Sequence, residues 1–238
     1  MKRIPELDGM RGIAISMVII WHYFSGAIAG GGTSLPVIIP LVRCTSWFWS
    51  GVDLFFVLSG FLIGGIIIDN RDSKNFLSVF YTRRAFRIFP VYFIFLGVFF
   101  ALRPWIKHAG YAWLLQGNVP DWSYLTFTQN ILMAVRDNSG GSFLNITWSL
   151  GIEEQFYLFA SLLSIALPRK HWPFFVVLLV VSAPVLRSFF PTFGPRYLLM
   201  PCRMDALLIG ALAAGVVRKV ATDLYVYVAT NGFYRQAS

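Results

Sequence analysis

The chain has 238 residues, of which 57% are hydrophobic and 13% are charged, and its mean hydropathy is +0.64. Soluble domains are roughly 45–50% apolar and about 25% charged, so this composition excludes a soluble globular protein. The net charge of +9 could indicate a protein that binds nucleic acid. The basic residues, however, gather at the ends of apolar stretches, as they do where they orient membrane helices. Nucleic acid is therefore not expected as a partner.

Apolar stretches close to the length that crosses a bilayer, about 20 residues, recur along the first half of the chain. The first predicted span covers 12–29 and ends at a glycine-rich turn, Gly30–Gly32. Residues 33–42 are apolar but short and contain two prolines, which favours an interfacial or re-entrant segment. The second predicted span, 47–68, opens with an aromatic cluster typical of the membrane interface. The third, 88–103, follows a basic segment.

The second half of the chain contains three more predicted spans. Residues 104–146 are the hardest part to assign, and within them Tyr124–Val135 is too short for a crossing. This segment predicts a re-entrant or interfacial helix. The fourth span covers 147–167 and the fifth 172–190. The sixth, 204–217, is rich in small residues that suit close helix packing.

The basic residues predict how these spans are oriented. If the chain has six spans and its N-terminus lies in the cytoplasm, thirteen of the 20 lysines and arginines lie on the cytoplasmic side of the membrane and seven on the outer side. This asymmetry agrees with the positive-inside rule, and a further crossing within 104–146 would reverse everything after it. The predicted fold class is an all-α, polytopic transmembrane helical bundle. Its membrane domain covers 1–218, and the tail at 219–238 shows no pattern that assigns it a structure.

Ionisable residues inside the predicted spans share one depth, and we call them the outer layer. At 1.5 Å per residue, His22 lies about 16 Å above Arg11 on the same face of the first helix. Asp53 in the second span, and Glu153 and Glu154 in the fourth, fall at about the same depth in the outer half of the bilayer. A carboxylate beside a histidine fixes its tautomer and stabilises its protonated form, as a general base requires. Ionisable residues so deep in a membrane indicate a functional site.

Arginines form a second group, the arginine layer, which the predicted topology puts at the cytoplasmic side: Arg11, Arg83, Arg84 and Arg87. Residues three or four apart are neighbours on a helix surface, as Arg84 and Arg87 are. Because the arginine fork matches phosphate, this layer predicts a phosphate-bearing donor that enters from the cytoplasm. The arginines could instead be topology signals, and the acidic residues could serve an ion pathway. A proton-coupled small-solute transporter therefore stays open as an alternative.

Five blocks of the sequence resemble the membrane acyltransferase-3 family, which includes bacterial O-acetyltransferases of surface polysaccharides and lipopolysaccharide. The blocks follow the family order and together extend over 7–214. They are LDGMRGIAISMVIIWHY (7–23), GVDLFFVLSGFLI (51–63), FYTRRAFRIFPVY (80–92), WSLGIEEQFYL (148–158) and RMDALLIGALAA (203–214).

The resemblance implies transfer of an acyl group, commonly acetyl from acetyl-CoA, to a sugar hydroxyl. The family's motif positions fall on Arg11 and His22 in the first helix, Arg84 and Arg87 in the third, and Glu153 and Glu154 in the glutamate block. We expect the arginines to bind the phosphates of acyl-CoA. We expect His22 to act as general base on the acceptor hydroxyl, or to carry the acyl group transiently, while a carboxylate of the outer layer orients it. No metal is expected.

Two further expectations follow from the resemblance. Members usually have about ten helices, some with an added extracytoplasmic hydrolase-like domain, whereas about six are legible here. The chain is therefore expected to be a C-terminally shortened member, and a truncated, inactive product is one alternative. The expected acceptor is a cell-surface carbohydrate or a lipid-linked glycan, and the expected location is the inner (plasma) membrane, which the chain would cross several times.

Overall fold

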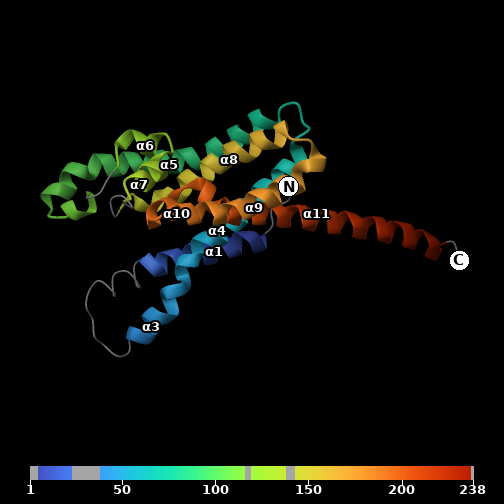
Figure 1. Ribbon diagram of the computed structural model, residues 1–238, viewed down its shortest axis with the longest axis horizontal. Coiled ribbons are helices and arrows are strands. Elements are labelled where there is room, and N and C mark those ends of the chain that lie inside the picture. Colours follow the sequence, from blue (N-terminus) through green and yellow to red (C-terminus); the bar gives the residue numbers. More distant parts are fainter. Residues whose placement is uncertain (1–4, 23–37, 116–118, 138–142, 237–238) are drawn as a thin grey trace. The chain divides into compact units, whose positions relative to one another are not determined.

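The computed structural model describes residues 5–22, 38–115, 119–137 and 143–236, and its regular elements within these ranges are all helical. The chain divides into two compact units by its internal contacts. Unit 1 comprises Met1–Ile66 and Ala206–Ser238, and unit 2 comprises Ile67–Asp205. Both boundaries fall inside long helices, α4 and α11, so each of these helices contributes residues to both units (Figure 1).

The described elements are α-helices, labelled α, and short 3-10 helices, labelled η. Those with residues in unit 1 are α1 (Pro5–Ile20), α3 (Ile38–Thr45), η2 (Ser46–Ser50), α4 (Gly51–Asn70) and α11 (Met200–Gln236). Those of unit 2 are α5 (Phe76–His108), η3 (Ala112–Leu115), α6 (Asp121–Leu125), α7 (Gln129–Val135), η4 (Asn145–Thr147), α8 (Trp148–Ala166), η5 (Arg169–His171), α9 (Trp172–Phe189) and α10 (Phe193–Leu198).

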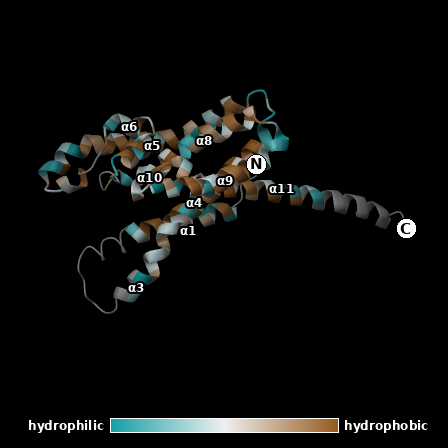
Figure 2. Ribbon diagram, viewed as in Figure 1, coloured by the Kyte–Doolittle hydropathy of each residue, from teal (hydrophilic) through white to brown (hydrophobic). Residues whose placement is uncertain are grey.

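Helical segments long and apolar enough to cross a membrane confirm the predicted fold class. Four such segments lie in the described residues: Arg43–Asn70, Phe76–His108, Arg169–Phe189 and Phe193–Asp223. They overlap the second, third, fifth and sixth predicted spans. Figure 2 colours most of α5 and α9 as hydrophobic, although the large apolar side chains of α9, such as Phe174 and Phe189, are exposed. Such a surface is stable in lipid, so the protein is a polytopic, all-α membrane protein.

The other predicted segments have mixed outcomes. The fourth predicted span coincides with the helix α8 to within a residue at each end, although α8 is not among the four described segments that are long and apolar enough to cross a membrane. The first is α1 in part, and its predicted residues from 23 to 29 lie outside the described ones, as does the turn Gly30–Gly32. The apolar segment 33–42 is described from Ile38, where α3 begins. The tail from 219 continues α11 to Gln236.

The region between α5 and α8 contains short helices. Among its described residues the longest is α7, with seven residues, and it lies inside the predicted segment Tyr124–Val135. A seven-residue helix is about 10 Å long, far short of the 30 Å apolar core of a bilayer. None of the described residues of this region therefore forms a helix that crosses the membrane.

Small residues bring α4 and α11 into contact within unit 1. A Cβ atom added to Gly60 would lie 1.8 Å from the Leu207 carbonyl oxygen, and one added to Gly210 would lie 2.0 Å from the Val57 carbonyl oxygen. Gly64 faces Ala211 in the same way, at 2.6 Å from its Cα atom. These positions accept only glycine as packed, which confirms the prediction that the small residues of 204–217 serve close packing.

In unit 2, α5 and α8 lie side by side and antiparallel (Figure 1). The Tyr81 hydroxyl and Ser161 Oγ are 2.5 Å apart near one end of the pair. Toward the other end of α5, the Tyr92 hydroxyl donates to the Tyr124 carbonyl oxygen at 2.8 Å, in α6. The Arg103 guanidinium donates two hydrogen bonds of 2.8 Å, one to each oxygen of the Asp121 carboxylate, close to the last turns of α5. Hydrogen bonds along its length therefore fix the register of α5 in unit 2.

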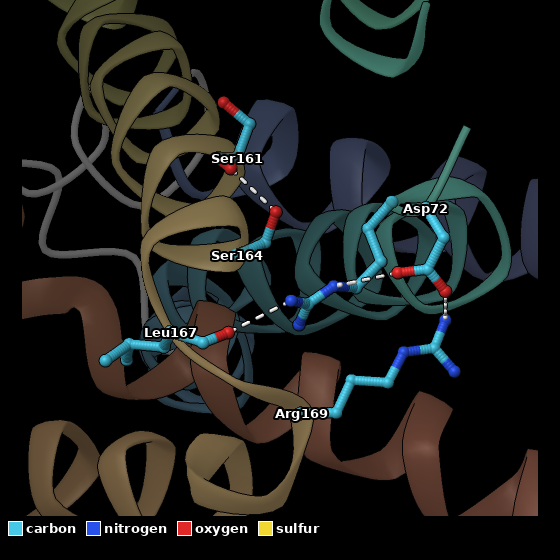
Figure 3. A network of polar contacts seen from close by, with 6 residues as sticks. Asp72, Ser161, Ser164, Leu167 and Arg169 are labelled. Atoms are coloured by element: carbon cyan, nitrogen blue, oxygen red, sulfur yellow. Dashed lines mark hydrogen bonds and ion pairs between the residues drawn. The ribbon is translucent and has the colours of Figure 1, made fainter. Parts of the chain in front are cut away.

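A charged network closes the turn after α8 (Figure 3). Arg71 donates a 3.0 Å hydrogen bond to the Leu167 carbonyl oxygen, which follows the last turn of α8. Asp72 pairs with Arg71 at 3.7 Å and also with Arg169. A guanidinium at a helix C-terminus satisfies an otherwise unpaired carbonyl and complements the helix dipole. The network therefore fixes where α8 ends.

Candidate active site

Three side chains form a buried polar cluster in the middle of unit 2. Glu153 and Tyr157 are four residues apart on α8 and therefore share one face. The Tyr157 hydroxyl donates to Glu153 Oε2 at 3.1 Å. The Arg84 guanidinium of α5 lies 4.8 Å from the centre of the Tyr157 ring. Arg84 is 8% exposed, Tyr157 3% and Glu153 4%, so the cluster is closed off from its surroundings.

The three arginines of α5 lie in different surroundings. Arg84 is buried close to a second aromatic ring, since its guanidinium also lies 5.7 Å from the centre of the Phe80 ring. Arg83 and Arg87 are both exposed. A step of three residues rotates about 300° around a helix, so Arg87 is displaced by about 60° from Arg84. The predicted pair is adjacent in position, but only Arg87 presents an open side chain.

Arg84 lies within a helix that is longer than the predicted third span. The sequence placed the start of the third span at residue 88, after the arginines, whereas α5 begins at Phe76. Arg84 lies eight residues inside the helix, about 12 Å from its start. On α8, Leu158, Leu162 and Ile165 point outward and are 50–52% exposed, as lipid-facing side chains are. Arg84 thus lies at the level of α8 that carries Tyr157 and Glu153, and the assignment of the arginine layer to the cytoplasmic side stays a prediction.

The two glutamates differ in their contacts. Glu153 is buried and its Oε2 accepts a hydrogen bond from Tyr157, whereas Glu154 is half-buried. The charge of Glu154 interacts with those of Arg84 and Glu153. Glu153 therefore contributes at least its Oε2 atom to the cluster.

Gln155 anchors this part of α8 to the short helices. Its side-chain amide donates to Asn130 Oδ1 at 2.8 Å and to the Phe127 carbonyl oxygen at 2.9 Å. The same Asn130 donates to the Leu198 carbonyl oxygen at 2.9 Å. Phe127 has a φ of +55°, and its ring stacks on that of Tyr92 with 4.8 Å between centres. Gln155 thereby fixes the rotation of the helix that carries both glutamates.

Unit 1 contains the other three predicted site residues. The Arg11 guanidinium lies 5.9 Å from the centre of the Phe55 ring, so this part of α1 faces α4. Asp53 is half-buried and lies two residues before Phe55 on α4. A Cβ on Gly51 would lie 2.7 Å from the Ala14 carbonyl oxygen, which shows how closely the two helices approach. Asp53 therefore stands in the segment of α4 that packs along α1.

His22 lies just beyond α1 and is exposed. Its Nδ1 is 2.9 Å from the Val18 carbonyl oxygen. A carbonyl oxygen only accepts, so Nδ1 carries the proton and the neutral ring has its lone pair on Nε2. The Trp21 ring meets the imidazole edge-on, at 4.8 Å between ring centres. Backbone and ring contacts thus orient the histidine, and its Nε2 can accept a proton.

The site can now be compared with the prediction. The sequence pointed to Arg84, Glu153 and Glu154 but gave no role to Tyr157 or Gln155. Both lie in the block WSLGIEEQFYL, and the spacing of four between Glu153 and Tyr157 could have shown that they share a helix face. No cluster of three or more His, Cys, Asp or Glu residues suited to a metal lies within the described ranges.

Comparisons with known proteins extend over most of the chain. The profile of an acyltransferase domain family, acyltransferase-3, matches residues 4–220. The peptidoglycan O-acetyltransferase OatA of Listeria monocytogenes is 30% identical over 166 residues, which make up 66% of this chain and 23% of that protein. The O-acetyltransferase OatA of Staphylococcus aureus (strain NCTC 8325) is 29% identical over 235 residues, 90% of this chain and 34% of that protein.

A further relative, from Staphylococcus aureus (strain COL), is 29% identical over 171 residues, 70% of this chain. The matched part is 26% of that protein, so the chain spans about a quarter of its length. No solved structure matches the chain.

Proposed function

Because the chain belongs to the acyltransferase-3 family, we propose that it transfers an acyl group from acyl-CoA to a hydroxyl of a cell-surface carbohydrate or lipid-linked glycan. The proposed acyl group is acetyl. The observation that carries the proposal is the buried cluster of Arg84, Tyr157 and Glu153 inside an apolar helix pair. Charge in such a place is costly to keep and usually serves a function. Relatives named as O-acetyltransferases support the O-acyl chemistry.

We assign the binding of the acyl-CoA donor to the arginines. Arg87 is exposed on α5 and offers a planar fork that suits a phosphate of CoA. Arg84 contributes its charge from the packed interior of the same helix. Arg11 of α1 is the third proposed donor contact, as the family pattern implies. Arginine is better suited than lysine to this task because it binds two phosphate oxygens at once and stays charged when it is buried.

We assign deprotonation of the acceptor hydroxyl to His22. Its Nε2 takes the proton of the acceptor hydroxyl as the oxygen attacks the thioester carbonyl carbon. The carbon–sulfur bond then breaks, the acyl group stays on the acceptor oxygen, and the proton passes to the leaving CoA sulfur. Asp53, Glu153 and Glu154 are the carboxylates that could stabilise the imidazolium. Transient transfer of the acyl group to His22 itself is a variant of the same route.

The proposed location is the inner (plasma) membrane, with the N-terminus in the cytoplasm. The excess of basic residues on the proposed cytoplasmic side, thirteen against seven, supports this orientation. It gives the arginines of α1 and α5 access to cytoplasmic acyl-CoA. The acceptor glycan would then be reached at or beyond the membrane, as the peptidoglycan named for one relative would be.

The experiment is expression of the full chain in a bacterium whose envelope carries no O-acetyl esters. We expect acetate that mild alkali releases from the envelope carbohydrate to appear with the wild-type chain. His22→Ala should abolish it at equal membrane levels, whereas His171→Ala, a change of an exposed histidine in η5, should leave it unchanged. Full activity of His22→Ala would overturn the assignment of the base. Absence of ester from cells with normal wild-type levels would overturn the function, and proton-driven solute uptake in those cells would favour the transporter.

A further inference from the structure

We propose that Tyr157 is a positioning residue for this reaction, whose ring holds the Arg84 guanidinium and whose hydroxyl fixes Glu153. The inference rests on the proposed acyl transfer and concerns a side chain to which the family motif pattern used above assigns no role. It gives one residue two separable tasks, one toward the donor-binding arginine and one toward the carboxylate.

The surroundings of Tyr157 shield both contacts from water. All three side chains of the cluster are at least 92% buried, so little water competes for the charges. A cation over an aromatic face is stabilised more when it is desolvated than on a wet surface. A hydroxyl that donates to a carboxylate likewise forms a charge-assisted bond, which is about twice as strong as a neutral one. The centre of the Tyr157 ring lies 4.8 Å from the Arg84 guanidinium, and the Tyr157 hydroxyl lies 3.1 Å from Glu153 Oε2.

The hydroxyl of Tyr157 does not join two helices. It bonds to Glu153, which lies on the same helix. Other tyrosines of unit 2 do join elements: Tyr81 of α5 bonds to Ser161 of α8, and Tyr92 bonds to the backbone of α6. Removal of the Tyr157 hydroxyl therefore removes no bond between helices. Its main consequence is that Glu153 Oε2 loses the hydrogen bond from Tyr157.

The ring of Tyr157 acts between α8 and α5. The Arg84 guanidinium lies 4.8 Å from the centre of the Tyr157 ring and 5.7 Å from the centre of the Phe80 ring. A planar group so enclosed has few rotamers open to it, so its N–H groups keep a fixed direction. Phenylalanine at 157 would keep this restraint, whereas leucine would remove the aromatic face.

The test uses the full chain in inverted membrane vesicles that carry the host's own lipid-linked glycans, with acetyl-CoA as the donor. Tyr157→Phe removes only the hydroxyl, Tyr157→Leu removes the hydroxyl and the ring, and Tyr81→Phe is the matched control. Initial rates against acetyl-CoA concentration give kcat and the donor KM separately. Membrane level and thermal unfolding in detergent are measured for each variant, so that rates are compared per folded molecule.

We expect Tyr157→Phe to lower kcat about tenfold with the donor KM within about twofold of wild type, because only the bond to Glu153 is lost. Tyr157→Leu should also raise the donor KM about tenfold, because Arg84 loses its aromatic face. Tyr81→Phe should leave both constants within about twofold, since its bond joins two uncharged groups.

Three results would count against the inference. Wild-type kinetics in Tyr157→Phe would show that the hydroxyl positions nothing, while acyl transfer by the wild-type chain would still stand. Equal losses in Tyr157→Phe and Tyr81→Phe would show that any hydroxyl in the helix pair has this effect. Absence of acetyl-CoA consumption by the wild-type chain would reject the proposed function and this role together.

Discussion

Substitution of Gly60 by alanine tests the helix contact on which unit 1 depends. The added Cβ atom would lie 1.8 Å from the Leu207 carbonyl oxygen and 2.8 Å from the Leu207 Cα atom, whereas real Cβ contacts below 3.0 Å are essentially absent. Both atoms belong to the backbone of α11, which cannot rotate away as a side chain would. The two helices must therefore move apart by more than about 1 Å, a distance at which a contact loses a quarter to a half of its dispersion energy.

We expect this separation to destabilise unit 1 by about 3 kcal/mol, the upper part of the range for overpacked cores, because the obstacle is backbone. For a chain of this size, that corresponds to a fall in Tm of roughly 6–12 °C. The measurement is thermal unfolding of purified protein in a mild detergent. Gly97→Ala on α5 is the matched control, since nothing lies within 4 Å of its added Cβ atom. This control should be neutral or slightly stabilising, by up to about 1 kcal/mol, because alanine favours helix.

A Tm for Gly60→Ala within about 1 °C of the Gly97→Ala value would refute the argument, given the shift of several degrees that a lost helix contact should produce. It would mean that α4 and α11 do not meet at this position.

The remaining predictions concern unit 2. Arg84→Gln should destabilise the fold by about 3–5 kcal/mol, because it leaves a buried carboxylate without its cation. Arg87→Gln should leave Tm unchanged and raise the acetyl-CoA KM. Equal Tm values for the two variants would contradict the difference in burial between Arg84 and Arg87. Gln155→Ala should lower stability by about 2 kcal/mol, measured as a Tm shift, because the side-chain amide donates two hydrogen bonds that anchor α8. Gln155→Glu keeps the size but cannot donate either bond when it is ionised, so it should lose at least as much; a wild-type Tm in Gln155→Glu would contradict the role of the two bonds. Asp121→Asn should change stability by less than about 1 kcal/mol, because the pair with Arg103 is partly exposed; a large Tm loss would show that the pair is structural.

Hydropathy alone predicted most of the helices, because an apolar stretch of bilayer length has few other stable structures. The main difference is at α5, a helix that begins at Phe76 and contains the predicted span 88–103. Arginines usually mark the end of a span, and local sequence cannot show that one of them has a partner far along the chain. Arg84 meets its partners on α8, and only the tertiary fold brings them together.

The candidate site was predictable in its residue types more than in its contacts. A motif could mark His22 and the glutamates, because unusual residues in apolar stretches stand out. It could not show that a backbone carbonyl at Val18 sets the tautomer of His22, or that Tyr157 stands between Arg84 and Glu153. Tyrosine is common in apolar helices, so its role becomes visible only from what its ring and hydroxyl touch.

The buried cluster has a consequence for how the protein is made. The helix that carries Arg84 leaves the ribosome before α8 exists, because Tyr157 follows it by about 70 residues, or roughly 4–15 s of synthesis at ordinary rates. During that interval the translocon must handle a span with an uncompensated charge, at a cost of about 2.5–3.5 kcal/mol if the charge is central. Membrane insertion of α5 should therefore be incomplete in chains that end before residue 147 and complete in those that extend through α8. Glycosylation sites placed after α5 in truncated nascent chains would report the difference.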